Sequence, residues 1–448
     1  MLETLRNAFK IEDIRKRISY TFLMLIVIRI GSQLPIPGVE TAFFKDFFAQ
    51  QNNDAFGFFN AMTGSSFTNM SVFALSITPY ITSSIIMQLL TIAIPKLEEM
   101  QRDGEDGRKK IAEYTRYVTV ALALIESIAM AIGFGGQGLL SEFNAISVII
   151  AVVTMTAGSA LLMWIGERIT ENGVGNGISI VLLFNIISSL PSDASTLYTR
   201  FMSGKSVAVS AVAAIIIVAI VIAIVVFVVV LQDGERRIPV QYSKKMQGRK
   251  MVGGQSSNIP LKVNTAGVIP VIFASSIMSF PVVIAQFFGS RINYDSIGGH
   301  ILLMLNSSNW FKPERPVYSI GMVIYIALII VFAYFYTSIT FNPLEVANNM
   351  KKSGGFIPGI RPGKPTSDYL NSILNYVVFI GACGLTIVCI IPIMVSGLFN
   401  VSRLSFGGTS LIIIVSVVLE TIKAIESQML VRCLLYTSPS PRDRSVSR

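Results

Sequence analysis

The residues of this sequence best suited to chemistry are the few charged side chains that interrupt its long apolar stretches. Arg29, Glu126, Glu420 and Lys423 lie within such stretches, and the last two are three apart and can pair on one helical face. Charged groups are costly at membrane depth and normally mark function there. A proton-coupled transporter or an intramembrane protease needs Asp, Glu or His at the middle of the membrane, and these four residues do not form such a set.

Histidine and cysteine give no metal site or catalytic nucleophile. His300 is the only histidine and falls in a predicted loop, so the two-histidine motif of zinc proteases is excluded. The three cysteines have no metal-ligand or redox spacing and are expected to be small packing residues. We therefore expect neither an enzyme nor a bound metal or cofactor.

Composition places the chain in a membrane. Of its 448 residues, 52% are hydrophobic and 14% are charged, whereas a soluble domain has roughly one quarter charged. Apolar runs of about 18 or more residues can cross the ~30 Å hydrocarbon core as helices. Ten stretches qualify, the fifth of them short: residues 18–34, 71–94, 118–134, 146–165, 178–190, 207–231, 266–288, 319–341, 369–395 and 410–430. The sequence predicts an all-α polytopic membrane protein.

The distribution of cations predicts how these helices are oriented. With the N-terminus inside, the inside segments hold far more Lys and Arg than the outside segments, as cytoplasmic loops do. Many of these cations lie in two long inside loops, 232–263 and 342–367. We expect both termini to be cytoplasmic. The net charge of +10 is then mainly a topology signal, although basic loops also suit anionic lipid or ribosomal RNA.

The ten predicted helices divide into two sets of five, and the odd number makes the second half run upside down relative to the first. The second helix of each half contains the string Pro-x-Ile-x-x-Ser, starting at Pro79 and at Pro270. Inverted repeats usually place the working site between the halves, near broken helices, and we expect the two prolines to mark such a break in each helix. Both helices are polar on one side, which fits either ordinary helix packing or two helices that meet across a separable seam.

Residues 55–70, ahead of the second helix, are apolar but too short and too rich in glycine to span a membrane. They are expected to form a re-entrant segment enclosed by protein, or an interfacial helix on the outer leaflet. In the helix that follows, Ile77, Ile81 and Ile85 recur every four residues on one face. A ring of such side chains could gate a passage by excluding water, although contact with lipid is the commoner role of a single isoleucine.

Seven short strings occur in order along the chain. The strings are RIG at 29–31 followed by PIPG at 35–38, GVGNGIS at 173–179, QGR at 247–249, FNP at 341–343, KKSG at 351–354, FIPGIRPG at 356–363 and FGGTS at 406–410. Each string alone is weak evidence, whereas seven in this order are specific, and together they resemble the SecY family.

The resemblance implies the protein-conducting channel of the bacterial Sec translocase, with two inverted five-helix halves around a central pore. Such a channel passes unfolded preproteins across the membrane and releases transmembrane segments sideways through a lateral gate. The implied pore ring is Ile77, Ile81, Leu182, Ile272, Ser276 and Ile413, with Leu182 where isoleucine is common. The implied plug, residues 55–67, includes Phe56, Phe59, Met62 and Phe67, and the implied gate residues are Gln88 and Asn264.

The resemblance also implies partners and a location. Arg361, with Arg249 and Lys250 in the companion loop, would dock the SecA motor ATPase and the ribosome. Other expected partners are the SecE and SecG subunits, preprotein signal sequences and anionic lipids, and SecDF and YidC are further candidates. The implied location is the bacterial plasma (inner) membrane.

The predicted domain organisation has four parts. A cytoplasmic amphipathic segment at 1–17, without the features of a cleaved signal peptide, precedes a first half at 18–195 and a second half at 196–431. The tail at 432–448 departs from the family pattern, is rich in Ser, Pro and Arg, and is expected to be disordered, non-native sequence. The alternative function is an inverted-repeat solute transporter, with uptake that depends on Glu126 or Arg29.

Overall fold

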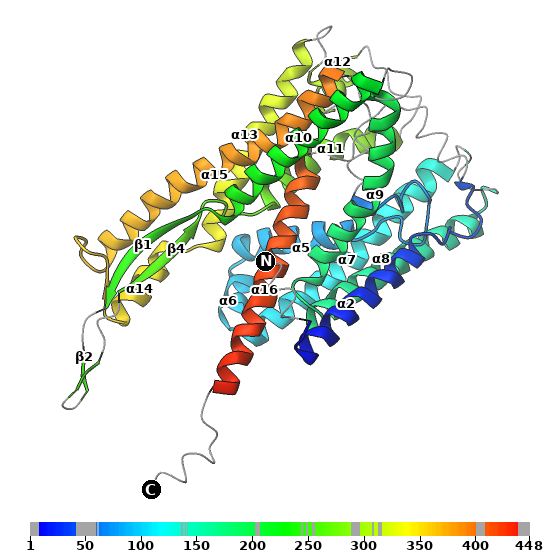
Figure 1. Ribbon diagram of the computed structural model, residues 1–448. Coiled ribbons are helices and arrows are strands. Elements are labelled where there is room, and N and C mark those ends of the chain that lie inside the picture. Colours follow the sequence, from blue (N-terminus) through cyan, green and yellow to red (C-terminus); the bar gives the residue numbers. More distant parts are fainter. Residues whose placement is uncertain are drawn as a thin grey trace.

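The protein is a bundle of long helices with a small β-sheet at one end, as the computed structural model shows (Figure 1). The structure describes residues 9–41, 60, 62–135, 138, 140, 142–201, 207–242, 245–247, 250–252, 256–287, 296–306, 309–311, 316–399 and 408–437. The long helices of the first half are α2 (Glu12–Gly31), α5 (Thr78–Ala93), α7 (Glu105–Phe134), α8 (Ala145–Asn172) and α9 (Gly177–Phe201). Those of the second half are α10 (Val207–Asp233), α11 (Ile269–Phe287), α13 (Ile320–Thr340), α15 (Lys364–Phe399) and α16 (Gly408–Thr437).

These helices cover most of each of the ten predicted stretches, which confirms the expectation of a helical polytopic protein. Within the described ranges, six helices are long and apolar enough to cross a membrane, or seven if the pair formed by α5 and α6 (Pro95–Arg102), bent by 106°, is one span. The apolar part of α11 is short, Ile269–Val282. α16 continues to Thr437, so helix extends six residues into the segment expected to be tail.

The second helix of each half, α5 in the first and α11 in the second, starts in the same way. Turns at 72–77 and 263–268 lead into α5 and α11, and Pro79 and Pro270 lie in the first turn of each helix. Proline is favoured there because the first N–H groups of a helix have no partner within it. Three residues before each proline the backbone turns left-handed, with φ of 52° at Ser76 and 63° at Gly267. The prediction that these prolines break their helices is therefore wrong, because they begin them.

The two basic loops are joined in one folded unit. Strands β1 (Glu235–Tyr242) and β4 (Ser256–Lys262) pair antiparallel, and β5 (Gly355–Phe356) pairs with the other edge of β1. The short strands β2 (Lys245–Gln247) and β3 (Lys250–Val252) form the tip of this hairpin. Ile238 of β1 shares a buried cluster with Met350 of α14 (Pro343–Lys352) and with Leu370 of α15. The sheet and α14 lie in the lower part of Figure 1, toward the same end as the C-terminal end of α16.

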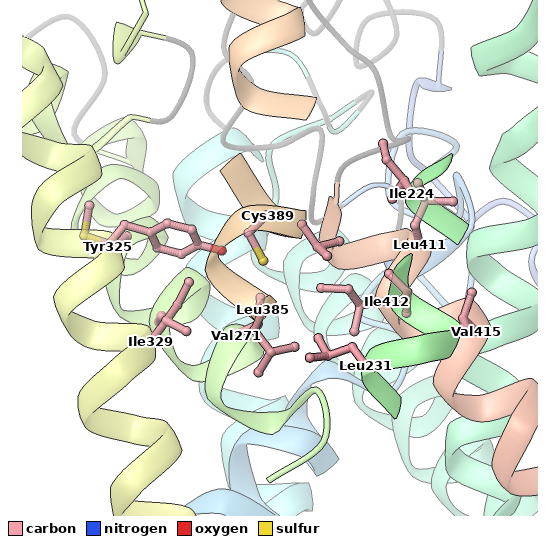
Figure 2. Packing of buried hydrophobic residues seen from close by; sticks show 14 of the residues in the cluster. Ile224, Leu231, Val271, Tyr325, Ile329, Leu385, Cys389, Leu411, Ile412 and Val415 are labelled. Carbon is pink, nitrogen blue, oxygen red and sulfur yellow. The ribbon is translucent and has the colours of Figure 1, made fainter. Parts of the chain in front are cut away.

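The second half has a core of its own, which we call the second-half core. Figure 2 shows Tyr325 of α13 directed toward Cys389 of α15, with Leu411 and Ile412 of α16 beside α10. Cys389 is buried in this core, in agreement with a packing role. α16 therefore presents Ile412 to its own half, and the next residue, Ile413, belongs to a different cluster.

Polar side chains of α5 and α11 form bonds inside their own halves. Ser83 donates a hydrogen bond to the carbonyl of Thr115 on α7 (2.7 Å), and Ser275 shares one with Tyr325 on α13 (3.2 Å). These two hydroxyl groups hold neighbouring helices of the same half together and do not lie at an interface between the halves. Lys423 pairs with Asp233 on α10 at 2.7 Å, so the predicted pair with Glu420 is wrong.

Candidate functional site

Side chains from both halves meet in one buried aliphatic cluster, which we call the central cluster. Ile77 at the start of α5 and Leu182 of α9 come from the first half and are 0% and 8% exposed. Ile272 of α11 and Ile413 of α16 come from the second half and are 8% and 2% exposed. Ile81 is half-buried and packs against the same cluster. Five of the six predicted ring residues are thus brought together across the boundary between the halves.

Ser276 is the predicted ring residue that lies outside the central cluster. It follows Ile272 by one helical turn on α11 and is exposed. A hydroxymethyl group has little apolar surface to bury, so it gains little from joining an aliphatic contact. The ring assignment at Ser276 stays a prediction.

Sequence reasoning missed several members of the central cluster, three of which stack on ring residues. Ile186 of α9 and Val417 of α16 are buried one turn beyond Leu182 and Ile413, and Val268 packs one turn before Ile272. Residues four apart lie one above the other on a helix, so each of these three ring residues has a second aliphatic residue stacked on it. This spacing is the signal that could have found them.

The central cluster can close a passage without any bound group. Its aliphatic side chains offer neither a hydrogen bond nor a charge, so water entering it loses hydrogen bonds and gains none. Burial of a whole Ile or Leu side chain is worth about 1.5–3 kcal/mol, which favours the closed arrangement until something replaces these contacts. A polypeptide between the halves could supply such contacts whatever its sequence.

The predicted plug lies partly outside the described residues, because Phe56 and Phe59 are not among them. Met62 is 4% exposed and belongs to the central cluster. Phe67 is 3% exposed and packs in a neighbouring cluster of the first half with Phe134 of α7. Of the described plug residues, Met62 therefore belongs to the cluster that holds the ring residues, and Phe67 does not.

The predicted gate residues occupy different positions relative to the second helix of each half, because Gln88 lies in the C-terminal half of α5 and Asn264 precedes the first residue of α11. Gln88 is half-buried on α5, whereas Asn264, in the turn before α11, is 5% exposed. The buried Nδ2 of Asn264 has no hydrogen-bond partner within the described part of the chain, so the structure does not join it to Gln88. α11 does contact α7 of the first half, which brings the second half against the first on this side.

Arg361 is exposed in a glycine-flanked loop beside the β-sheet. Gly359 and Gly363 adopt φ of 84° and 111°, which L side chains rarely do, and the Thr366 hydroxyl donates to the Arg361 carbonyl at 2.8 Å. Arg249 is outside the described residues, as is the side chain of Lys250 on β3. The loop shares its buried cluster with β1, so one surface carries both basic loops.

The chain resembles known proteins over nearly its whole length. Residues 71–422 match the sequence model of the SecY family. The protein translocase subunit SecY of Corynebacterium glutamicum is 42% identical over 446 residues, covering 95% of this chain and 97% of the relative. The protein of the same description from Halalkalibacterium halodurans is 42% identical over 438 residues, covering 96% and 98%.

Solved structures of low sequence identity share the fold. One described as "The structure of a protein conducting channel" has a TM-score of 0.61 at 18% identity and covers 93% of each chain. A second, on the plug domain of the SecY protein in the closed state, has a TM-score of 0.60 at 17% identity, covering 93% of this chain and 92% of that one. Sec61 in a canine ribosome-channel complex has a TM-score of 0.58 at 17% identity and 93% coverage of each.

Proposed function

Because the chain belongs to the SecY family, we propose that its central cluster is the closed constriction of a protein-conducting channel. The chain is a multi-pass membrane protein and a channel subunit of the Sec translocase, and it is not an enzyme. The alternative of a solute transporter is therefore wrong. What remains to be assigned is which residues form the channel and which bind its partners.

One observation carries the assignment of the constriction. Ile77, Leu182, Ile272 and Ile413 come from four helices of both halves and are buried in one cluster with Met62 of the plug segment. Within a bundle whose halves have separate cores, such a cluster is the contact that must part when the halves separate. It is also the place where an apolar seal excludes water and ions most effectively.

The mechanism follows because this contact is made by apolar side chains alone. When a preprotein segment enters, the aliphatic side chains move from contact with each other to contact with the segment, and the plug segment moves away. α5 and α11 then serve as the two sides of the lateral gate, with Gln88 and Asn264 as its polar residues. The buried Nδ2 of Asn264, which has no hydrogen-bond partner among the residues that the structure describes, supports this role, because a polar group that gains a partner or water on opening favours the open state.

The cytoplasmic face is the proposed docking surface for the motor and the ribosome. Arg361, exposed in its glycine-flanked turn, would dock the SecA motor, with Arg249 and Lys250 contributing from the companion basic loop. The canine Sec61 structure contains a ribosome, which supports the same role for this face. We further propose SecE and SecG as subunits, a bacterial plasma membrane location and both termini in the cytoplasm.

Reconstitution tests this proposal. The chain would be assembled with SecE and SecG in liposomes, supplied with SecA, ATP and a signal-bearing preprotein, and scored by the fraction of preprotein protected from external protease. We expect ATP-dependent protection in the native chain and its loss in Arg361→Glu. Absence of protection in an assembled complex, with a known channel active in parallel, would refute the proposal.

A further inference from the structure

The described end of the predicted plug and the turns that follow it, up to α5, have a strained backbone. Ser65, Met70 and Ser76 have φ of 67°, 41° and 52°, in the left-handed region that side chains disfavour. Such a conformation persists only where surrounding groups impose it. Residues 62–76 therefore need anchors from outside the segment, and we call these residues the strained segment.

Three polar side chains from α2 and α9 supply those anchors. The Arg29 guanidinium donates through Nη1 to the Ser188 hydroxyl at 2.6 Å and to the Gly64 carbonyl at 3.3 Å. Ser188 donates to the same carbonyl at 3.5 Å. Asn185 donates through Nδ2 to the Met62 carbonyl at 3.2 Å and to the Ser76 hydroxyl at 3.0 Å. Asn185 thus ties one end of the strained segment to the other.

The fit is close as well as polar. Gly64 has φ of 63°, and a Cβ there would lie 3.0 Å from the Cα of Asn185, so the segment packs directly on the α9 backbone. Arg29 lies in the last turn of α2, where a cation already suits the helix dipole. It does not simply extend to water, since its guanidinium is directed at the strained segment. Arg29, the charged residue within the first predicted helix, is thus used to bind the strained segment.

We propose that Arg29, Asn185 and Ser188 are positioning residues that hold the strained segment, which includes the described end of the proposed plug, in the resting conformation. The inference rests on the proposed function and adds the contacts that opening must break. Departure of the plug removes the hydrogen bonds to the carbonyls of Met62 and Gly64 while it releases the backbone strain. The strength of these bonds therefore sets how readily the resting channel opens.

Thiol labelling in the assembled channel tests the positioning role. Ser66, which is 2% exposed, becomes the reporter as Ser66→Cys in a chain whose own cysteines are replaced, and its reaction with a water-soluble maleimide is timed in proteoliposomes without substrate. Ion conductance of the same channels is recorded in parallel. The variants are Arg29→Met and Asn185→Ala, with Ser188→Ala as a milder change should either fail to assemble.

The matched control is Ser189→Ala. Ser189 neighbours Ser188 on α9, but its hydroxyl donates to the Ile186 carbonyl within the helix. We expect labelling and conductance to rise about tenfold in Arg29→Met and Asn185→Ala, because a hydrogen bond to a charged or buried group is worth at least that factor. In Arg29→Lys, which keeps a cationic donor, the labelling rate and the conductance should lie close to the native values. In the Ser189→Ala control, both should equal those of the native chain.

The outcomes separate this inference from the proposed function. Native rates of labelling in assembled Arg29→Met and Asn185→Ala channels would overturn it, as would equal increases in the Ser189→Ala control. Ile413→Asn serves as a constriction variant in the same recordings. If Ile413→Asn raises conductance while Arg29→Met and Asn185→Ala do not, the positioning role is refuted and the constriction assignment is retained. If it also leaves conductance unchanged, the constriction assignment itself fails.

Discussion

Ile413→Asn is the substitution that most directly weakens the closed constriction. Ile413 is 2% exposed in the central cluster, and asparagine is close to it in size but carries an amide that needs hydrogen bonds. In the closed channel that amide is buried among aliphatic groups. In an open, hydrated pore it is solvated, so the substitution penalises the closed state far more than the open one.

The size of the effect follows from burial. An unpaired buried amide costs about 1–3 kcal/mol, and the loss of a buried isoleucine side chain costs about 1.5–3 kcal/mol. Allowing for partial relaxation of the cluster, the closed state loses about 2–4 kcal/mol relative to the open one. At 1.4 kcal/mol per factor of ten, the open fraction of the resting channel rises about 30- to 700-fold.

The assay is single-channel or ensemble ion conductance of the purified complex in planar bilayers without substrate. Ile412→Asn is the matched control, because Ile412 is 0% exposed but belongs to the second-half core. It should reduce the amount of assembled complex without raising the conductance of each channel. Equal conductance of Ile413→Asn and the native chain, with both assembled, would refute the reasoning.

Three further predictions concern docking, backbone and charge. Arg361→Glu should reduce SecA-driven preprotein protection at least about tenfold with unchanged complex assembly, since hydrogen bonds to charged groups are worth about 1.5–3 kcal/mol. The control Lys364→Glu should have little effect, and similar export in both variants would contradict the docking role. Gly267→Ala should destabilise the complex by about 1–2 kcal/mol in thermal unfolding, because φ is 63° at this position. The cause is the backbone conformation alone, since no atom lies within 4 Å of the new Cβ. An unchanged unfolding temperature would contradict this. Asp233→Asn removes the exposed pair with Lys423 and should change stability by less than about 1 kcal/mol, an effect that salt reduces; a larger, salt-independent loss would show a role beyond the pair.

The helices and two of the six ring residues could be predicted from the sequence because their signals are local. Apolar runs long enough to span a membrane mark the helices, and Ile77 and Ile81 share a face by their spacing alone. The contact of Ile272 and Ile413 with the first half is not local, and only the family resemblance supplied it. The structure then brings the two together in one cluster.

Other features depend on contacts between distant residues and were missed or wrong. Lys423 pairs with Asp233, 190 residues away, although Glu420 has the better local spacing. The pairing of β1 with β4 joins segments that were predicted as a loop. The anchors at Asn185 and Ser188 have no sequence signal, because a polar residue in an apolar helix can bond its own helix, as Ser189 does.

The most direct test of the central claim is photo-crosslinking to a preprotein arrested during translocation. A photoreactive residue would replace Leu182 in one complex and Ile412 in another, since the first side chain lies in the central cluster and the second in the second-half core. The constriction predicts strong crosslinks to the arrested chain from position 182 and none from position 412. Equal crosslinking from both positions, or none from 182 while translocation intermediates are present, would contradict it.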